Sequence, residues 1–155
     1  MKARSVLVLL GLAAAVAVAC SSSSPTTYTI DGTCGPLTVG SSGAVFTVHG
    51  PCALGQAGNF TLGASLNVTF GADGGVPVSI DAGFAQGGNI LYSTFNGIAD
   101  VPGNPLSAPI IINGAFNFSG GTGPYADATG HATADGGVDL AGLTASLNLV
   151  GSVSY

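Results

Sequence analysis

The stretch NFTLGASLNVTF, residues 59–70, alternates apolar and polar side chains without a break. Successive side chains of an extended chain point to opposite sides, so the apolar members all fall on one face. The other face carries only Asn, Thr, Ser and Gly. We therefore predict a long β-strand with one buried and one exposed face.

The same alternation resumes in residues 76–84, after the turn-like sequence Ala72-Asp73-Gly74-Gly75. Two alternating runs around Asp-Gly-Gly are typical of a β-hairpin. Residues 101–109 contain three prolines and are predicted to form a loop. Further strands are expected at 90–98, 110–118 and 145–155, with shorter ones at 28–31, 37–39, 44–48 and 129–134.

These patterns predict an all-β protein, an antiparallel β-barrel of about eight strands, with a β-sandwich as the alternative. No long helix is expected after residue 20, because helical periodicity is absent and Gly and Pro are dense. The outward positions carry almost no charge, and a sheet edge without Lys invites pairing with other chains. Closing the sheet removes such edges, so the barrel is favoured over the sandwich.

The N-terminal segment has the features of an export signal. Lys2 and Arg4 precede an apolar run at residues 5–19, which has the length of a signal peptide core and is too short for a membrane-spanning helix. Residues 17–20, Ala-Val-Ala-Cys, resemble the lipobox of bacterial lipoproteins, although Leu is commoner than Ala at the first position. The resemblance implies cleavage before Cys20 and acylation of that cysteine, and two or more acyl chains anchor a protein stably. The alternative is ordinary secretion with a free Cys20.

The chain is therefore divided into a signal peptide (1–19), a Ser/Thr/Pro tether that begins with the lipidated cysteine (20–27), and a single β-barrel domain (28–155). The expected location is the bacterial cell envelope. In the lipoprotein pattern of Gram-negative bacteria, Asp after the cysteine retains the protein on the inner membrane. Ser21 stands there instead, so the resemblance implies the outer membrane.

Charge excludes several classes of function. Lys2 and Arg4 are the only basic residues besides two histidines, and all seven acidic residues are Asp. Without Lys or Arg after residue 4, the domain cannot neutralise phosphates, so nucleic-acid binding is excluded. An arginine clamp for an acidic substrate and a basic patch for anionic lipids are excluded for the same reason.

With Cys20 assigned to lipid, Cys34 and Cys52 remain and are expected to form a disulfide in an oxidising compartment. Both lie in Gly/Pro-containing sequences, residues 32–36 and 49–52, which are predicted to be turns. The alternative is a metal site that adds His49, although no close ligand pair such as Cys-x-x-Cys is present. We expect neither a metal nor another cofactor.

A glycine-rich motif, GGTGPYADATG, spans residues 120–130. It resembles a segment of dirigent-like and allene-oxide-cyclase-like β-barrels, and the resemblance extends over residues 110–155. It implies a barrel corner, across which Tyr125 packs. Two positions depart from the family pattern: Pro124 replaces a basic residue and Tyr125 replaces Phe. The family's catalytic Arg or Glu is missing, so no catalytic residue is carried over. The motif residues are Gly120, Gly121, Thr122, Gly123, Tyr125 and Gly130.

Three functions are compatible with these features. The first is a lipid-tethered binding protein that holds a small apolar molecule in the barrel interior. The second is a structural or adhesive envelope protein that associates with copies of itself through uncharged faces. The third is a dirigent-like or cyclase-like isomerase, which lacks the polar residues that such chemistry needs. The side chains expected to line a cavity are Phe60, Leu66, Phe70, Phe84, Ile112, Phe116 and Leu147.

Overall fold

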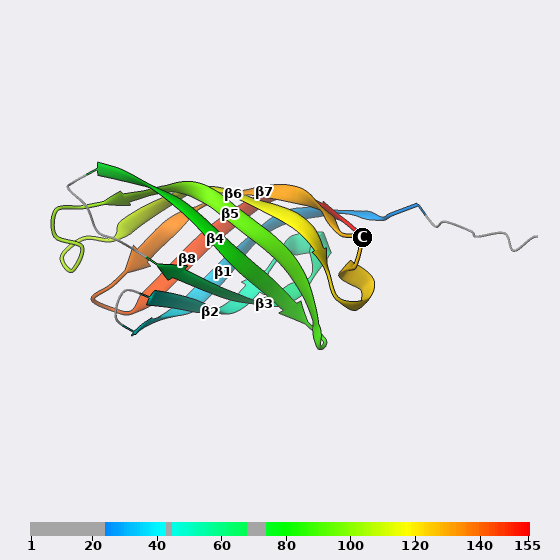
Figure 1. Cartoon of the computed structure of the whole chain (residues 1–155), viewed down its shortest axis with the longest axis horizontal. Helices are drawn as coiled ribbons and strands as arrows, with labels where there is room; N and C mark the ends of the chain where they lie inside the picture. The colour runs from blue at the N-terminus through cyan, green and yellow to red at the C-terminus, as the bar shows by residue number, and fades with distance from the viewer. Residues whose placement is uncertain (1–23, 43–44, 68–73) are drawn as a thin grey trace, which may run out of the picture.

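The computed structural model describes residues 24–42, 45–67 and 74–155, which form a closed barrel of eight antiparallel strands (Figure 1). Each strand pairs with the next one along the chain, and the last pairs with the first. The all-β prediction is thus confirmed, and the barrel rather than the sandwich is formed. The strands are β1 (Thr27–Ser42), β2 (Val45–Ala53), β3 (Asn59–Asn67), β4 (Gly74–Gln86), β5 (Asn89–Val101), β6 (Ile110–Gly121), β7 (Thr129–Asp139) and β8 (Thr144–Ser154).

Several predictions from the sequence fall outside these described residues. They are the signal peptide (1–19), the lipidated Cys20 with the start of the tether, Phe70, and the Ala72-Asp73 part of the predicted turn.

The period-two alternation produces the two faces of the barrel wall. In β3, Phe60 and Leu62 are buried, whereas Ser65 is exposed. In β4, Val78 and Phe84 are buried in the same way. The strands therefore place most of their apolar side chains inside the barrel and most of their Ser, Thr and Asn side chains outside.

The sequence did not predict the tight hairpin between β4 and β5. Gln86 pairs with Asn89, so only Gly87 and Gly88 form the turn. Both glycines have positive φ, 57° and 84°. A two-residue hairpin turn of this kind requires left-handed backbone at both positions, which glycine adopts without a steric penalty.

The predicted turns around the two cysteines are wrong, because both cysteines lie in strands. The two short strands expected at 28–31 and 37–39 are one strand, β1, whose register shifts at Gly35-Pro36 on both its β2 and its β8 side. A bulge accommodates a proline within a sheet, because no ladder hydrogen bond is needed there. Cys34 faces Cys52 on β2, with Cα atoms 3.9 Å apart, and the two form a disulfide.

The two ends of the barrel differ (Figure 1). At the closed end lie two short 3-10 helices, η1 (Gly55–Ala57) and η2 (Gly123–Tyr125), together with the β4–β5 turn. The N-terminal tether and the C-terminus also meet there, since the backbone groups of Thr26 and Tyr155 exchange two hydrogen bonds, of 3.0 and 3.1 Å. The opposite end, the loop end, carries the β1–β2, β5–β6 and β7–β8 connections.

Candidate functional site

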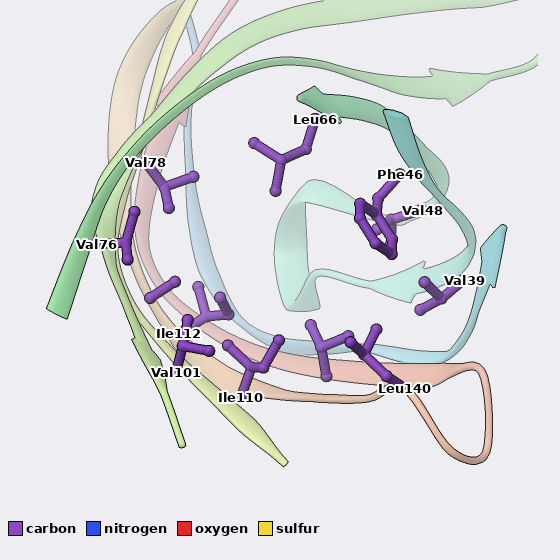
Figure 2. Close-up of a pocket in the computed structure, with 12 residues that line it drawn as sticks. Val39, Phe46, Val48, Leu66, Val76, Val78, Val101, Ile110, Ile112 and Leu140 are labelled. Carbon is purple, nitrogen blue, oxygen red and sulfur yellow. The ribbon is translucent and has the colours of Figure 1, made fainter. Parts of the chain in front are cut away.

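The described side chains leave space inside the loop-end half of the barrel. This half contains two adjoining cavities, an outer one of about 70 Å³ and an inner one of about 80 Å³, which together we call the chamber. Figure 2 shows side chains from several strands converging on the outer cavity. Every described side chain that lines the chamber is apolar. Those of the outer cavity are Val39, Phe46, Val48, Leu66, Val76, Val78, Ala99, Val101, Ile110, Ile112, Val138 and Leu140. The inner cavity shares five of these and adds Leu37, Leu62, Ala64, Ile80, Ala82, Phe95, Phe116, Ala145 and Leu147.

Alternation along single strands brings this lining together. On β4, the residues Val76, Val78, Ile80 and Ala82 all line the chamber. Six residue steps at a rise of about 3.4 Å, in a strand tilted by about 40°, correspond to roughly 15 Å along the barrel axis. The chamber is therefore long enough for a short hydrocarbon chain or a small ring system.

A pair of facing glycines shapes the lower wall of the chamber. Gly97 on β5 is the register partner of Gly114 on β6. A Cβ atom on either would lie only 2.7 or 2.6 Å from Cζ of Phe95, so the ring occupies the space that the glycines leave open. Phe95 in turn packs against Phe116, with ring centroids 5.1 Å apart. The two rings form one side of the chamber floor.

Beyond the floor the interior is filled by aromatic side chains. Phe84 is fully buried and packs edge-on against Phe116, Phe118 and Phe60, at centroid distances of 5.3, 5.8 and 6.3 Å. Phe60 continues the contact to Tyr125 at 5.9 Å. This aromatic chain makes the closed half solid, so it blocks access to the chamber from the closed end.

Tyr125 seals the closed end. Its side chain is 3% exposed, and its hydroxyl donates a hydrogen bond to Oε1 of Gln86. Gln86 Nε2 in turn donates to the carbonyl oxygen of Asn59 at 2.8 Å. Tyr155 packs against Tyr125 at a centroid distance of 4.8 Å and stacks on Tyr28 at 4.6 Å. Burial, and secondarily the neighbouring tyrosines, raises the pKa of Tyr125 and of Tyr155 above the ordinary value.

The glycine-rich motif builds the turn that carries Tyr125. Gly120, Gly123 and Gly130 have positive φ values of 85°, 58° and 150°. Thr122 ties this turn to β5, because its Oγ1 accepts a hydrogen bond from the Ile90 N–H at 2.9 Å and its own N–H donates to the Ile90 carbonyl at 2.8 Å. At Gly121, a Cβ atom would lie 2.2 Å from that same carbonyl oxygen. All six motif residues thus lie at the closed end, away from the chamber.

The structure separates the side chains that were expected to line a cavity. Leu66 and Ile112 line both cavities, and Phe116 and Leu147 line the inner one. Phe60 and Phe84 lie in the aromatic packing of the closed half instead. The alternation placed Val76, Val78, Ile80, Ala82 and Phe84 on the inner face. It did not predict that the aliphatic residues of this set would line a cavity.

The acidic and histidine side chains lie away from the chamber. Every Asp in the described residues is exposed, and so are His49 and His131. The carboxylate of Asp139 accepts hydrogen bonds from the N–H groups of Ala141 and Gly142, at 2.9 and 3.0 Å, which fixes the β7–β8 turn. The alternative metal site at Cys34 is not formed, since its sulfur is bonded to Cys52 and His49 is on the outer face.

Within the part of the chain that the structure describes, no cluster of three potential metal ligands occurs. In the same residues, no helix has the length and apolar character to cross a membrane. Among the described residues, the chamber lining contains no acid, base or nucleophile, and its apolar side chains can bind a ligand by shape and by exclusion of water. Comparison with protein-family models, curated proteins and solved structures gives no match to this chain.

Proposed function

We propose that this protein binds a small apolar molecule in the chamber of its barrel. The observation that carries the proposal is a cavity lined by apolar side chains alone, next to a closed half that is filled with aromatic rings. A cavity with no polar partner for water is a dry site that takes up apolar molecules. A protein that needed only stability would gain by filling the same space with side chains.

The area available for burial supports micromolar binding. A ligand that buries about 300 Å² of apolar surface gains about 7.5 kcal/mol from water exclusion at 25 cal/mol per Å². Association itself costs several kcal/mol in lost motion, which is partly offset by close packing against the walls. A net gain of about 5–7 kcal/mol corresponds to dissociation constants between about 10 and 200 μM for ligands that fit.

The loop end is the access route. Its rim carries exposed apolar side chains, namely Val45 at 36%, Leu106 at 67% and Leu143 at 50% exposure. Such side chains favour the approach of an apolar ligand, because they lower the cost of leaving water at the mouth. The aromatic packing and Tyr125 block the other end.

We also propose the lipid anchor on Cys20, which is supported by the lipobox-like sequence. The described tether leaves the barrel at the closed end, so the mouth would face away from the anchoring membrane (Figure 1). Replacing the cysteine, Cys20→Ser, should release the protein from membranes in a fractionation experiment. Unchanged membrane retention of this variant would refute the anchor.

The binding function is tested with N-phenylnaphthylamine, an uncharged dye that fluoresces in apolar sites. The protein should bind it with a micromolar dissociation constant, and Ala64→Phe should weaken binding at least tenfold by filling the inner cavity. Ala85→Phe is the matched control, because Ala85 is exposed on the outer wall of β4 and should leave binding unchanged. If the dye does not bind, or if both variants weaken it equally, the proposal is wrong.

A further inference from the structure

We infer that the chamber selects uncharged apolar ligands and rejects the carboxylate of a fatty acid. The inference rests on the proposed function and names its ligand class. Its basis is the charge distribution of the molecule rather than the shape of the cavity.

The described lining of the chamber offers no partner for a buried anion. In the part of the chain that the structure describes, all lining side chains are hydrocarbon. Apart from Tyr125 at the closed end, the only buried side chain with a hydroxyl in the described residues is Ser93, and this hydroxyl donates to the carbonyl oxygen of Ala82 at 3.2 Å. A carboxylate drawn into the chamber would lose its hydration without gaining a cation or a free hydrogen-bond donor from a side chain. Burial of an ion under these conditions is strongly unfavourable.

The charge that surrounds the chamber is negative. The only Lys and Arg of the chain, Lys2 and Arg4, precede the described residues, so the described barrel has no cation apart from a protonated histidine. Both histidines are exposed on the outer face. The formal charges around the chamber therefore come from Asp alone, and they repel an anion whose own charge is poorly screened inside the barrel.

The outer face of the barrel wall beside the loop end carries the same sign. Asp100 is next to the lining residue Val101 at the loop end of β5, and Asp139 ends β7 beside the lining residue Leu140. Both carboxylates are exposed. They lie on the outer side of the wall, away from the chamber, so they act on a ligand head at the mouth only through their field, which favours a cationic head over an anionic one.

The test is competition against N-phenylnaphthylamine at pH 8 with three ligands that share a ten-carbon tail: decanol, decanoate and decyltrimethylammonium, each below its micellar concentration. Decanol should displace the dye at a concentration at least ten times lower than decanoate, a difference of about 1.4 kcal/mol. Decyltrimethylammonium should displace it at least three times better than decanoate. Displacement by decanoate equal to that by the cation would overturn the inference.

A pH series separates the charge of the ligand from its shape. As the pH falls through the carboxyl pKa, about 4–5 for a simple carboxylic acid, decanoate becomes neutral and its displacement should approach that of decanol. The described lining of the chamber has no titratable group, so displacement by decanol should change by less than twofold over the same range. An unchanged ratio of decanoate to decanol would contradict the inference.

A charge-insertion variant tests the same point from the protein side. Val101→Lys places an ammonium at the half-buried mouth, where the long side chain can reach water. It should improve displacement by decanoate at least fivefold and leave decanol within twofold. Val150→Lys, at a position 57% exposed on the outer wall, makes the same charge change away from the chamber and should alter neither.

If displacement by decanoate improved equally in both lysine variants, the net charge of the protein rather than the chamber would determine the binding of decanoate, and the inference would be overturned. The wild-type competition series decides the inference even where Val101→Lys does not fold. Failure of the dye to bind wild type would instead overturn the proposed function, and with it this inference.

Discussion

Ala99→Leu is expected to stabilise the protein, because Ala99 lines the outer cavity and is only 7% exposed. Leucine adds three carbon atoms, and burial of each contributes about 0.8 kcal/mol, or about 2.4 kcal/mol together. Ordering the leucine side chain costs about 0.5–1 kcal/mol. The free energy of unfolding should therefore rise by about 1.5 kcal/mol, and the melting temperature by about 5 °C for a domain of this size.

The assay is urea unfolding followed by far-ultraviolet circular dichroism, with the disulfide intact. Ala132→Leu is the matched control, since Ala132 is fully buried on β7 but does not line the chamber. Its Cβ lies only 2.9 Å from where a Cβ on Gly151 would stand, so the site is tightly packed. Overpacking there should destabilise by about 1–3 kcal/mol. A loss of similar size in Ala99→Leu would refute the claim that the loop-end half is hollow.

Three further predictions concern stability. Replacing both Cys34 and Cys52 with Ala should lower the free energy of unfolding by about 3 kcal/mol in the chain-entropy model, because the disulfide closes a short loop between residues 18 positions apart. An unchanged urea midpoint would contradict this prediction. Burial raises the pKa of Tyr125 and Tyr155, so the folded state holds their protons more tightly than the unfolded chain does. Stability should therefore be complete below pH 10 and fall above it, by at most about 1.4 kcal/mol per pH unit for each tyrosine. Substituting both with Phe should flatten this loss, and an equally steep loss in the variant would argue against their burial. Gly97→Ala places a Cβ 2.4 Å from a backbone oxygen of β6 and should cost about 1–3 kcal/mol by thermal unfolding; a neutral result would refute the close approach of β5 and β6.

The strands with strict alternation were predictable from the sequence. Residues 59–67 and 110–118 lie within β3 and β6 as expected, because a period of two leaves little choice about which face is buried. The continuity of β1 through Gly35-Pro36 was not predictable. That dipeptide is typical of a turn, and only pairing with strands on both sides shows that it forms a bulge instead.

Alternation also could not separate the chamber from the solid core, because it assigns a face but not a depth along the barrel axis. A second signal was present in the size of the inward residues. β4 changes from Val76 and Val78 to Phe84, and β6 changes from Ile110 to Phe118. Both strands run from the loop end to the closed end, so the aliphatic residues gather around the chamber and the phenylalanines fill the other half. Recognising this requires the pairing and register of the strands, which the sequence alone does not provide.

The most direct measurement of the central claim is a crystal structure of the protein under xenon pressure. Xenon enters dry apolar cavities that have room for it. We expect xenon density inside the loop-end half of the barrel, in contact with Leu66 and Ile112. This density should be lost in crystals of Ala64→Phe, because the larger side chain fills the inner cavity. A barrel whose side chains fill this space and admit no xenon would contradict the account.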